Sequence, residues 1–248
     1  MGNPGLSTGH GITISYLVSI DMKFIHDRST SLSTVVLVLF IIGVLQGGIS
    51  YSISYGKLDS LIAWMEHGFW PTLANIVRLL LLVILLALWL LNRKLALFKT
   101  IIVVNALLTL GLFLNMFSLA DVLRGVVYQD VKTLLADVVL LAVANMLIFS
   151  IWYWIIDPPG VDGSVRDDEP WDFLFPQRAQ TIPYYENWQP RYTDYIYLAF
   201  TTSFAFSPTD TLPLTRRAKM LMLTQSTISI VTLTAIAGAA INILAGGS

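Results

Sequence analysis

The residue types best suited to chemistry in this 248-residue sequence gather in one short stretch, TTSFAFSPTD, at positions 201–210. The stretch combines hydroxyls, aromatic rings and a carboxylate, on Thr201, Thr202, Ser203, Phe204, Phe206 and Asp210. Hydroxyl and carboxylate oxygens can replace part of the water around a cation, and apolar rings can close a narrow passage by expelling water. This combination predicts a constriction at which side chains select an ion.

The elements around this stretch are expected to be a short helix before it and a long helix after it. The preceding run, YIYLAFTTSFAF, would form a helix of only about 18 Å at 1.5 Å per residue, which can enter a bilayer but cannot cross it. It is either a re-entrant hairpin inside an oligomer or an aromatic helix at the membrane surface. In the second case Phe204 and Phe206 are anchors and SPTD is an ordinary turn, in which Pro208 fixes φ and Asp210 caps the next segment of the chain.

This arrangement resembles the pore region of the two-helix potassium-channel domain. In that family an aromatic pore helix leads to the filter Thr-Thr-Val-Gly-Tyr-Gly-Asp, and DYIYLAFTTSFAFSPTD followed by an apolar helix has the same outline. The filter glycines, which let backbone carbonyls turn toward the ion, are replaced here by Phe204, Ala205 and Phe206. Asp210 also lies farther from Thr202 than the filter motif allows. The resemblance therefore implies a pore loop without potassium selectivity.

A more extensive resemblance is to a family of uncharacterised bacterial integral membrane proteins. Its members carry an FP…DY.Y.aFT…tD…tr.a pattern before a last helix that ends in Asn. The matching positions here are Phe175, Pro176, Asp194, Tyr195, Tyr197, Phe200, Thr201, Thr209, Asp210, Thr215, Arg216, Ala218 and Asn242. The resemblance covers the last third of the chain well. It implies membership in that family and a place in the bacterial inner membrane, but no activity.

The composition places the whole chain in the membrane class. Hydrophobic residues make up 55% of it and charged residues 12%, whereas soluble domains carry roughly 25% charged residues. Five segments approach the roughly 20 apolar residues that cross a bilayer. They are Thr34–Tyr55, Trp70–Leu91, Leu97–Leu119, Val131–Ile156 and Ala218–Leu244. The expected fold is an all-α polytopic membrane protein with five transmembrane helices and a short re-entrant or interfacial helix before the last span.

Three regions can be drawn from this layout. Residues 1–30 hold the apolar stretch GITISYLVSI, which is too short to span and is expected at the membrane interface. Residues 31–130 form a three-helix membrane region, and residues 131–248 contain a helix, an acidic loop, the short pore-like helix and the last helix. The loop and its exit, residues 157–194, hold eight of the sixteen acids but only three basic residues, so they would concentrate cations at the mouth of a pore.

One face of the last expected helix is polar or small along its whole length. Steps of three and four residues, which follow one face of a helix, connect Gln225, Ser229, Thr232, Ala235, Ala239 and Asn242. Small and hydroxylated residues allow membrane helices to pack closely and to form hydrogen bonds. Water in a pore would be lined by the same residue types, so this stripe is either a packing face or a pore lining.

A second polar set lies inside the other expected spans. If consecutive spans alternate in direction, Gln46, Arg78, Asn115 and Asp137 reach a similar depth near one membrane face. An isolated charge at that depth costs several kcal/mol, so Arg78 and Asp137 are expected to form an ion pair, with the two amides filling the remaining hydrogen bonds. The pair is either structural or a proton- or ion-coupling site.

The remaining sequence features do not favour an enzyme. The chain has no cysteine, its three histidines are scattered, and it has no Ser/His motif and no phosphate-binding glycine loop, so neither a cofactor nor a metal site is predicted. Two functions remain: an oligomeric pore-loop ion channel, or a non-conducting structural or regulatory subunit of a membrane complex. The expected partners are the lipid bilayer and other protein subunits, identical or different. The net charge of −1 gives no reason to expect nucleic acid.

The basic residues predict the orientation of the chain in the membrane. With five spans, eleven Lys and Arg residues fall on the side of the N-terminus and the acidic loop, and three fall on the other side. Lys and Arg prefer the cytoplasmic side, so the N-terminus and the acidic loop are expected in the cytoplasm. A potassium-channel pore loop enters from outside, so the charge count and the resemblance predict opposite orientations.

A cysteine introduced into the acidic loop tests this orientation, because the chain has no cysteine of its own. In the variant Gly163→Cys, the new thiol should resist an impermeant thiol reagent applied to intact cells and should react after the cells are opened. Rapid labelling of intact cells would reverse the orientation.

Overall fold

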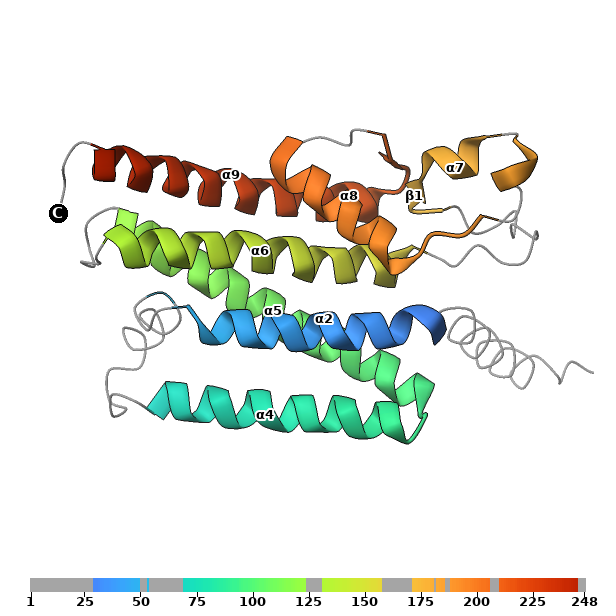
Figure 1. Ribbon diagram of the computed structural model, residues 1–248, viewed down its shortest axis with the longest axis horizontal. Coiled ribbons are helices and arrows are strands. Elements are labelled where there is room, and N and C mark those ends of the chain that lie inside the picture. The colour runs from blue at the N-terminus through green and yellow to red at the C-terminus, as the bar shows by residue number, and fades with distance from the viewer. Residues whose placement is uncertain are drawn as a thin grey trace, which may run out of the picture.

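The computed structural model describes a mostly helical chain, built from six long or medium helices and a small two-stranded sheet among the residues it describes (Figure 1). The described residues are 29–49, 53, 69–123, 131–157, 171–180, 182–185, 188–205 and 210–244. The expected interfacial segment, residues 1–30, lies outside them except for its last two residues, which begin the first described helix.

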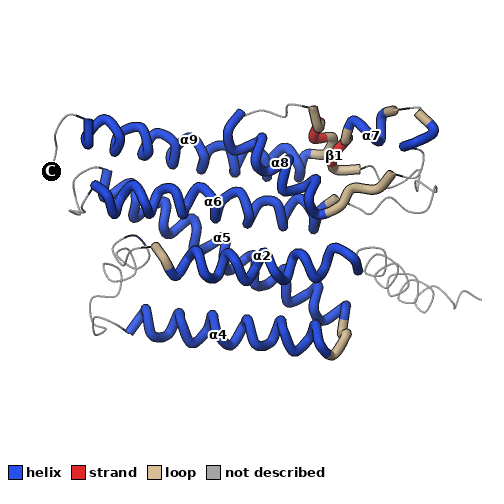
Figure 2. The backbone as a smooth tube through the Cα atoms, in the orientation of Figure 1, coloured by secondary structure: helices blue, strands red, loops and turns tan. Residues whose placement is uncertain are grey.

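The helices follow the apolar segments of the sequence. They are α2 (Ser29–Gly47), α4 (Phe69–Leu90), α5 (Lys94–Leu123), α6 (Val131–Ile156), the four-residue α7 (Pro176–Ala179), α8 (Tyr192–Ala205) and α9 (Arg216–Leu244). A 3₁₀ turn covers Pro183–Tyr185, and the strands β1 (Phe173–Leu174) and β2 (Leu212–Pro213) pair antiparallel. Figure 2 shows how small the extended part is beside the helices.

Three of these helices are long and apolar enough to cross a membrane, judged over the described residues. They are Lys94–Val122, Lys132–Ile156 and Arg216–Gly238, and they correspond to the third, fourth and fifth spans expected from the sequence. The first and second expected spans overlap shorter apolar helices, Ser31–Gly47 and Ile76–Leu90. These lengths fit a membrane protein, and the count of five spans stays a prediction.

The helices pack into a bundle in which α6 is central (Figure 1). On one side of α6 lies α9, with α8 against both, and on the other side lie α2 and α5. The helix α4 packs on α2 and α5 at the edge of the bundle. Large apolar side chains cover its outer surface, for example Leu79, Leu80 and Val83. An apolar surface of this extent is costly in water, which fits a membrane protein.

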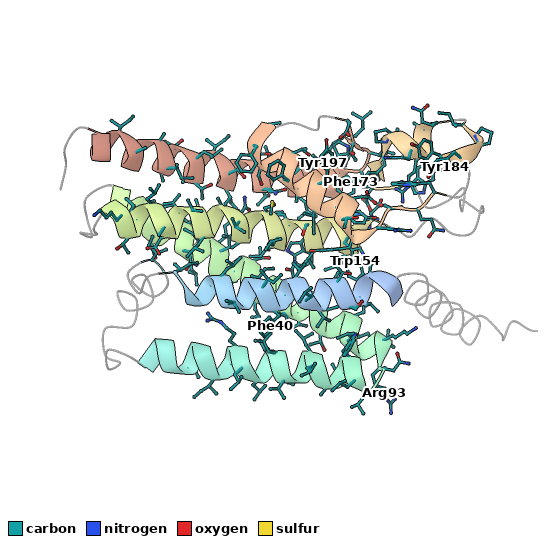
Figure 3. The ribbon with its side chains drawn as sticks, viewed as in Figure 1. Phe40, Arg93, Trp154, Phe173, Tyr184 and Tyr197 are labelled. Carbon is teal, nitrogen blue, oxygen red and sulfur yellow. The ribbon has the colours of Figure 1, made fainter. Side chains whose placement is uncertain are left out.

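Polar residues end α4 and turn the chain into α5. Asn92 adopts a left-handed conformation, with φ of 52°, which asparagine tolerates better than most residues. The N–H of Arg93 then donates to the carbonyl of Leu88 across 3.1 Å, so the exposed end of α4 is satisfied by its own turn. Figure 3 shows Arg93 at the same end of the molecule as Trp154 and Phe173, where α6 ends.

The short helix α8 runs from that end into the bundle, and the chain then returns to the same end. Its first turn lies beside the end of α6, because the rings of Tyr192 and Trp154 are in edge contact. Its last turn lies beside Gln225, about 14 Å along α9 at 1.5 Å per residue. The strand β2 nevertheless pairs with β1, which comes after α6 in the chain. The segments before and after α8 therefore lie at the same end of the bundle.

Candidate functional site

The entry of α8 into the bundle is organised around a buried carboxylate directly after α6. Asp157 is 0% exposed, and its Oδ1 accepts the backbone N–H groups of Asp172 and Phe173 across 3.1 and 3.2 Å. Its Oδ2 accepts Nη1 of Arg178 across 3.1 Å and the hydroxyl of Tyr195 across 2.7 Å. A buried carboxylate is stable only with such partners, so Asp157 holds α6, β1, α7 and α8 together.

A second buried carboxylate fixes the start of α9 at the same place. Asp172 accepts Nε and Nη2 of Arg217 across 2.7 and 2.6 Å, a two-point contact that matches the shape of the guanidinium. It also accepts the hydroxyl of Thr215, and its own carbonyl accepts the N–H of Leu214. We call Asp157, Asp172, Arg178, Tyr195 and Arg217 the end cluster.

Aromatic rings fill the space around the end cluster. The ring of Phe175 lies 5.6 Å from that of Tyr195, nearly perpendicular to it, and the guanidinium of Arg178 lies 4.7 Å from the ring of Trp171. Edge contacts of this kind, and a cation over a ring, add to the burial of the rings themselves. The end cluster therefore joins the end of α6 to the segments before α8, and it sets the position from which α8 starts.

The first turn of α8 carries its own cap. The N–H of Arg191 donates to Oδ2 of Asp194 across 2.6 Å. Burial raises the pKa of the Asp194 carboxyl, while the hydrogen bond from Arg191 and the Arg191 charge lower it. An acid at the start of a helix also interacts favourably with the helix dipole.

Deeper in the bundle, one glutamine joins the three helices α6, α8 and α9. Gln225 is 0% exposed. Its Nε2 donates to the Ala199 carbonyl across 2.9 Å and to Oγ of Ser203 across 2.8 Å, and its Oε1 accepts the hydroxyl of Tyr153. Because every polar atom of this side chain has a partner, its burial is compensated. We call Gln225 with Tyr153, Ser203 and Ala199 the Gln225 junction.

Two further buried contacts join the same helices. Nδ2 of Asn145 on α6 donates to Oγ of Ser229 on α9 across 2.9 Å. The hydroxyls of Ser150 on α6 and Tyr192 on α8 lie 2.7 Å apart and share a hydrogen bond. The polar side chains of α6 thus bond to α9 and α8 along much of their contact.

The three hydroxyls expected at a constriction are used within the chain. Thr202 is fully buried and donates to the Leu198 carbonyl across 2.8 Å. Ser203 is buried in the Gln225 junction. Thr201 is half-buried and donates to the carbonyls of its own helix. The burial of Thr202 and Ser203 favours a packing role for these two hydroxyls.

The other expected constriction residues are more accessible where they are described. Phe204 is 52% exposed and its ring lies 4.7 Å from that of Phe200. With Tyr197, which Figure 3 shows on α8, these rings form an exposed aromatic face of the helix. Asp210 is exposed. Phe206 lies outside the described residues.

The polar stripe of the last helix faces α6. Its described members are all buried inside the chain, namely Gln225, Ser229, Thr232 and Ala235. Nothing is described of the side chains of Ala239 and Asn242. The packing interpretation accounts for the buried part of the stripe, since close contact with α6 explains both the small and the hydroxylated residues.

The four residues of the expected intramembrane cluster lie on helices that contact one another. Asp137 and Asn115 are buried, and Gln46 and Arg78 are half-buried. The Arg78 side chain lies against the last turns of α2, with Nη1 3.4 Å from where a Cβ on Gly47 would stand. Gly48, directly after α2, lies close to Leu140 of α6, because a Cβ on Gly48 would stand 3.2 Å from Leu140 Cδ1. Leu140 lies one turn beyond Asp137. Arg78 and the turn of α6 that carries Asp137 thus both reach the end of α2, and their ion pair stays a prediction.

Most of the residues that organise this site were not predicted from the sequence. Asn145 and Tyr153 sit inside an apolar span. Asn145 carries the same sequence signal as Asn115, an amide within such a span. Asp157 and Asp172 were counted only as members of an acidic loop. Their partners are distant in sequence, so no local spacing marks them.

Comparison with protein-family models, with curated proteins and with solved structures finds no match to this chain. The part of the chain that the structure describes holds no group of three or more histidine or acidic side chains placed to hold a metal ion. The site is therefore characterised by its own geometry: a short helix fixed at both ends by buried polar side chains, with an aromatic face left exposed.

Replacing Gln225 with leucine tests the Gln225 junction. The change keeps the volume but leaves the Tyr153 hydroxyl, the Ser203 hydroxyl and the Ala199 carbonyl with one partner fewer. Buried polar groups without partners cost about 1–3 kcal/mol each, so Gln225→Leu should lower the free energy of unfolding by about 3 kcal/mol or more. The measurement is thermal unfolding of the purified protein in detergent.

The matched control is Thr227→Val on the same helix. Thr227 is exposed and its hydroxyl donates only to the Leu223 carbonyl of its own helix, so the change should cost about 0.5 kcal/mol or less. Equal melting temperatures for the two variants would show that the Gln225 junction contributes no stability.

The expected ion pair of Arg78 and Asp137 is tested by a double-mutant cycle. Removing one partner of a buried pair costs about 3–5 kcal/mol, while replacing both with apolar residues costs less. Arg78→Leu and Asp137→Leu should each lower the melting temperature more than the double variant does. Additive effects of the two changes would mean that the residues do not interact.

Proposed function

We propose that this chain is a membrane protein in which α6, α8 and α9 form a pore-loop module of an oligomeric, weakly selective ion channel. The observation that carries the proposal is the course of α8, which enters the bundle from the end where α6 stops and is followed by a return to that end. A helix of 14 residues reaches about 20 Å, less than the hydrocarbon thickness of a bilayer. In a membrane, such a course makes α8 re-entrant.

The assembly would use the surfaces that the single chain leaves exposed. The aromatic face of α8 carries Phe200 and Phe204, and the outer face of α9 carries Met220, Leu223 and Ile230, all about half exposed or more. Copies arranged around a central axis would bring the α8 ends and the segment after them together. In this proposal five helices span the membrane, with α2 and α4 forming the remaining two spans.

The proposed pathway does not select potassium. No glycine occurs between Thr201 and Asp210, so the backbone lacks the residue that turns carbonyls inward at low cost. The hydroxyls of Thr202 and Ser203 are engaged inside the chain. Ions would therefore pass with much of their water, and Phe204 and Phe206 would form the narrowest point.

Location, orientation and family are part of the same proposal. The Lys and Arg count favours a cytoplasmic N-terminus and acidic loop, and the sequence pattern of the last third favours the family of uncharacterised bacterial integral membrane proteins and an inner-membrane location. In this orientation the module enters from the cytoplasmic side, opposite to potassium channels.

One observation favours a second candidate, a non-conducting subunit of a membrane complex. The polar groups of α8 and α9 that could have contacted ions are bonded to each other or to α6, so they serve the fold of the single chain. The exposed aromatic face of α8 would then dock a different membrane protein.

Ion flux through purified protein in liposomes separates the two candidates. Phe204→Ala with Phe206→Ala should raise the leak severalfold, because smaller side chains keep a narrow pore wet, and Asp210→Asn should reduce any preference for cations. The wild-type protein should discriminate little between potassium and sodium.

The control variant is Phe40→Ala on α2. Phe40 is 52% exposed, as Phe204 is, but it lies on α2, outside the proposed module, as Figure 3 shows. Strong potassium selectivity would contradict the filter argument. Absence of flux from the wild type and from the double phenylalanine variant, in vesicles shown to contain folded protein, would favour the subunit.

A further inference from the structure

Two asparagines in the middle of the bundle each present an oxygen that the described residues leave without a hydrogen bond. Asn105 on α5 and Asn145 on α6 are both 0% exposed. In each side chain Nδ2 donates a hydrogen bond, while Oδ1 is buried and has no donor among the described residues. A buried acceptor left in this condition costs about 1–3 kcal/mol, so each oxygen needs a donor.

The neighbours of the two amides decide which end of each is the oxygen. Nδ2 of Asn105 lies 3.2 Å from the Ile148 carbonyl, and Nδ2 of Asn145 lies 3.4 Å from the Gln225 carbonyl. A carbonyl only accepts hydrogen bonds. Rotating either amide by 180° would place two oxygens against each other, so the unbonded end of each amide is the oxygen and the orientation is not arbitrary.

Both oxygens lie at mid-depth of candidate membrane spans. Asn105 lies about 17 Å along α5 and Asn145 about 21 Å along α6, at 1.5 Å per residue, and the two helices run in opposite directions (Figure 1). The Asn105 region of α5 is also tied to α6 by Trp152, whose Nε1 donates to Oγ1 of Thr109 across 2.8 Å. Water at the membrane surface cannot reach these positions directly.

The chemistry of the oxygens points to a neutral donor. Each is an uncharged amide oxygen. The groups that accept hydrogen bonds from the same two amides are also neutral, namely two backbone carbonyls and the hydroxyl of Ser229. A cation that met a single neutral oxygen in a low-dielectric interior would keep most of its desolvation cost. A water molecule donates to such an oxygen without that cost, and buried waters commonly complete polar groups of this kind.

We propose that Asn105 Oδ1 and Asn145 Oδ1 each bind an ordered water molecule inside the bundle, one at the α5–α6 contact and one near the α6–α9 contact. These sites belong to the interior of a single chain and are separate from the pathway proposed at the ends of α8. The water at Asn145 adjoins the Gln225 junction, because Asn145 donates to the Gln225 carbonyl.

The direct test is a high-resolution experimental structure of the wild-type protein in lipid nanodiscs. Each oxygen should have a density peak about 2.7–3.2 Å away. The variant Asn145→Leu should lose its own peak and keep the one at Asn105, and Asn105→Leu should do the reverse. Either oxygen in contact only with carbon atoms, or bonded to a protein donor, would overturn the proposal for that site.

A second measurement separates water from a bound cation. Melting temperatures of the wild type in sodium, potassium and choline chloride at equal ionic strength should agree, because water binding does not depend on the salt cation. A rise in sodium or potassium that disappears in Asn145→Leu or Asn105→Leu would identify a cation at that site and overturn the assignment to water. Neither result depends on whether the protein conducts ions.

Discussion

The buried carboxylate of Asp157 is the interaction on which the C-terminal half of this protein depends. It stands directly after α6, out of contact with solvent, and four donors satisfy it, one from Asp172 and one each from β1, α7 and α8. Without those donors the charge could not remain buried. The requirement therefore fixes where the loop after α6 returns, where α8 begins and, through Asp172 and Arg217, where α9 begins.

The same requirement acts again deeper in the bundle. Gln225 is fully buried, so its polar atoms find their partners on α6 and α8. Helix α8 is thus held at its start by Asp157 and near its end by Gln225. This double attachment makes a short helix stable in an apolar bundle, although its own length would give it little stability.

These attachments divide the inner surfaces of the helices from the outer ones. Polar side chains such as Ser203, Gln225 and Ser229 are buried among α6, α8 and α9. Aromatic or aliphatic side chains such as Phe200, Phe204 and Leu223 remain outside. Acyl chains or further subunits can cover an apolar outer surface without leaving polar groups unsatisfied. The interior chemistry and the assembly surface are consequently separate, and the two buried asparagine oxygens belong to the interior.

Local composition determined the helical class, the apolar segments and the shortness of α8, because hydropathy and helix length depend only on neighbouring residues. Helical spacing also showed that Gln225, Ser229 and Thr232 share a face. What covers that face depends on packing between distant segments, so only the tertiary structure placed its described part against α6. It likewise turned Asp157 and Asp172, which in the sequence belong to an acidic loop, into buried anchors, because their donors come from residues up to 45 positions away.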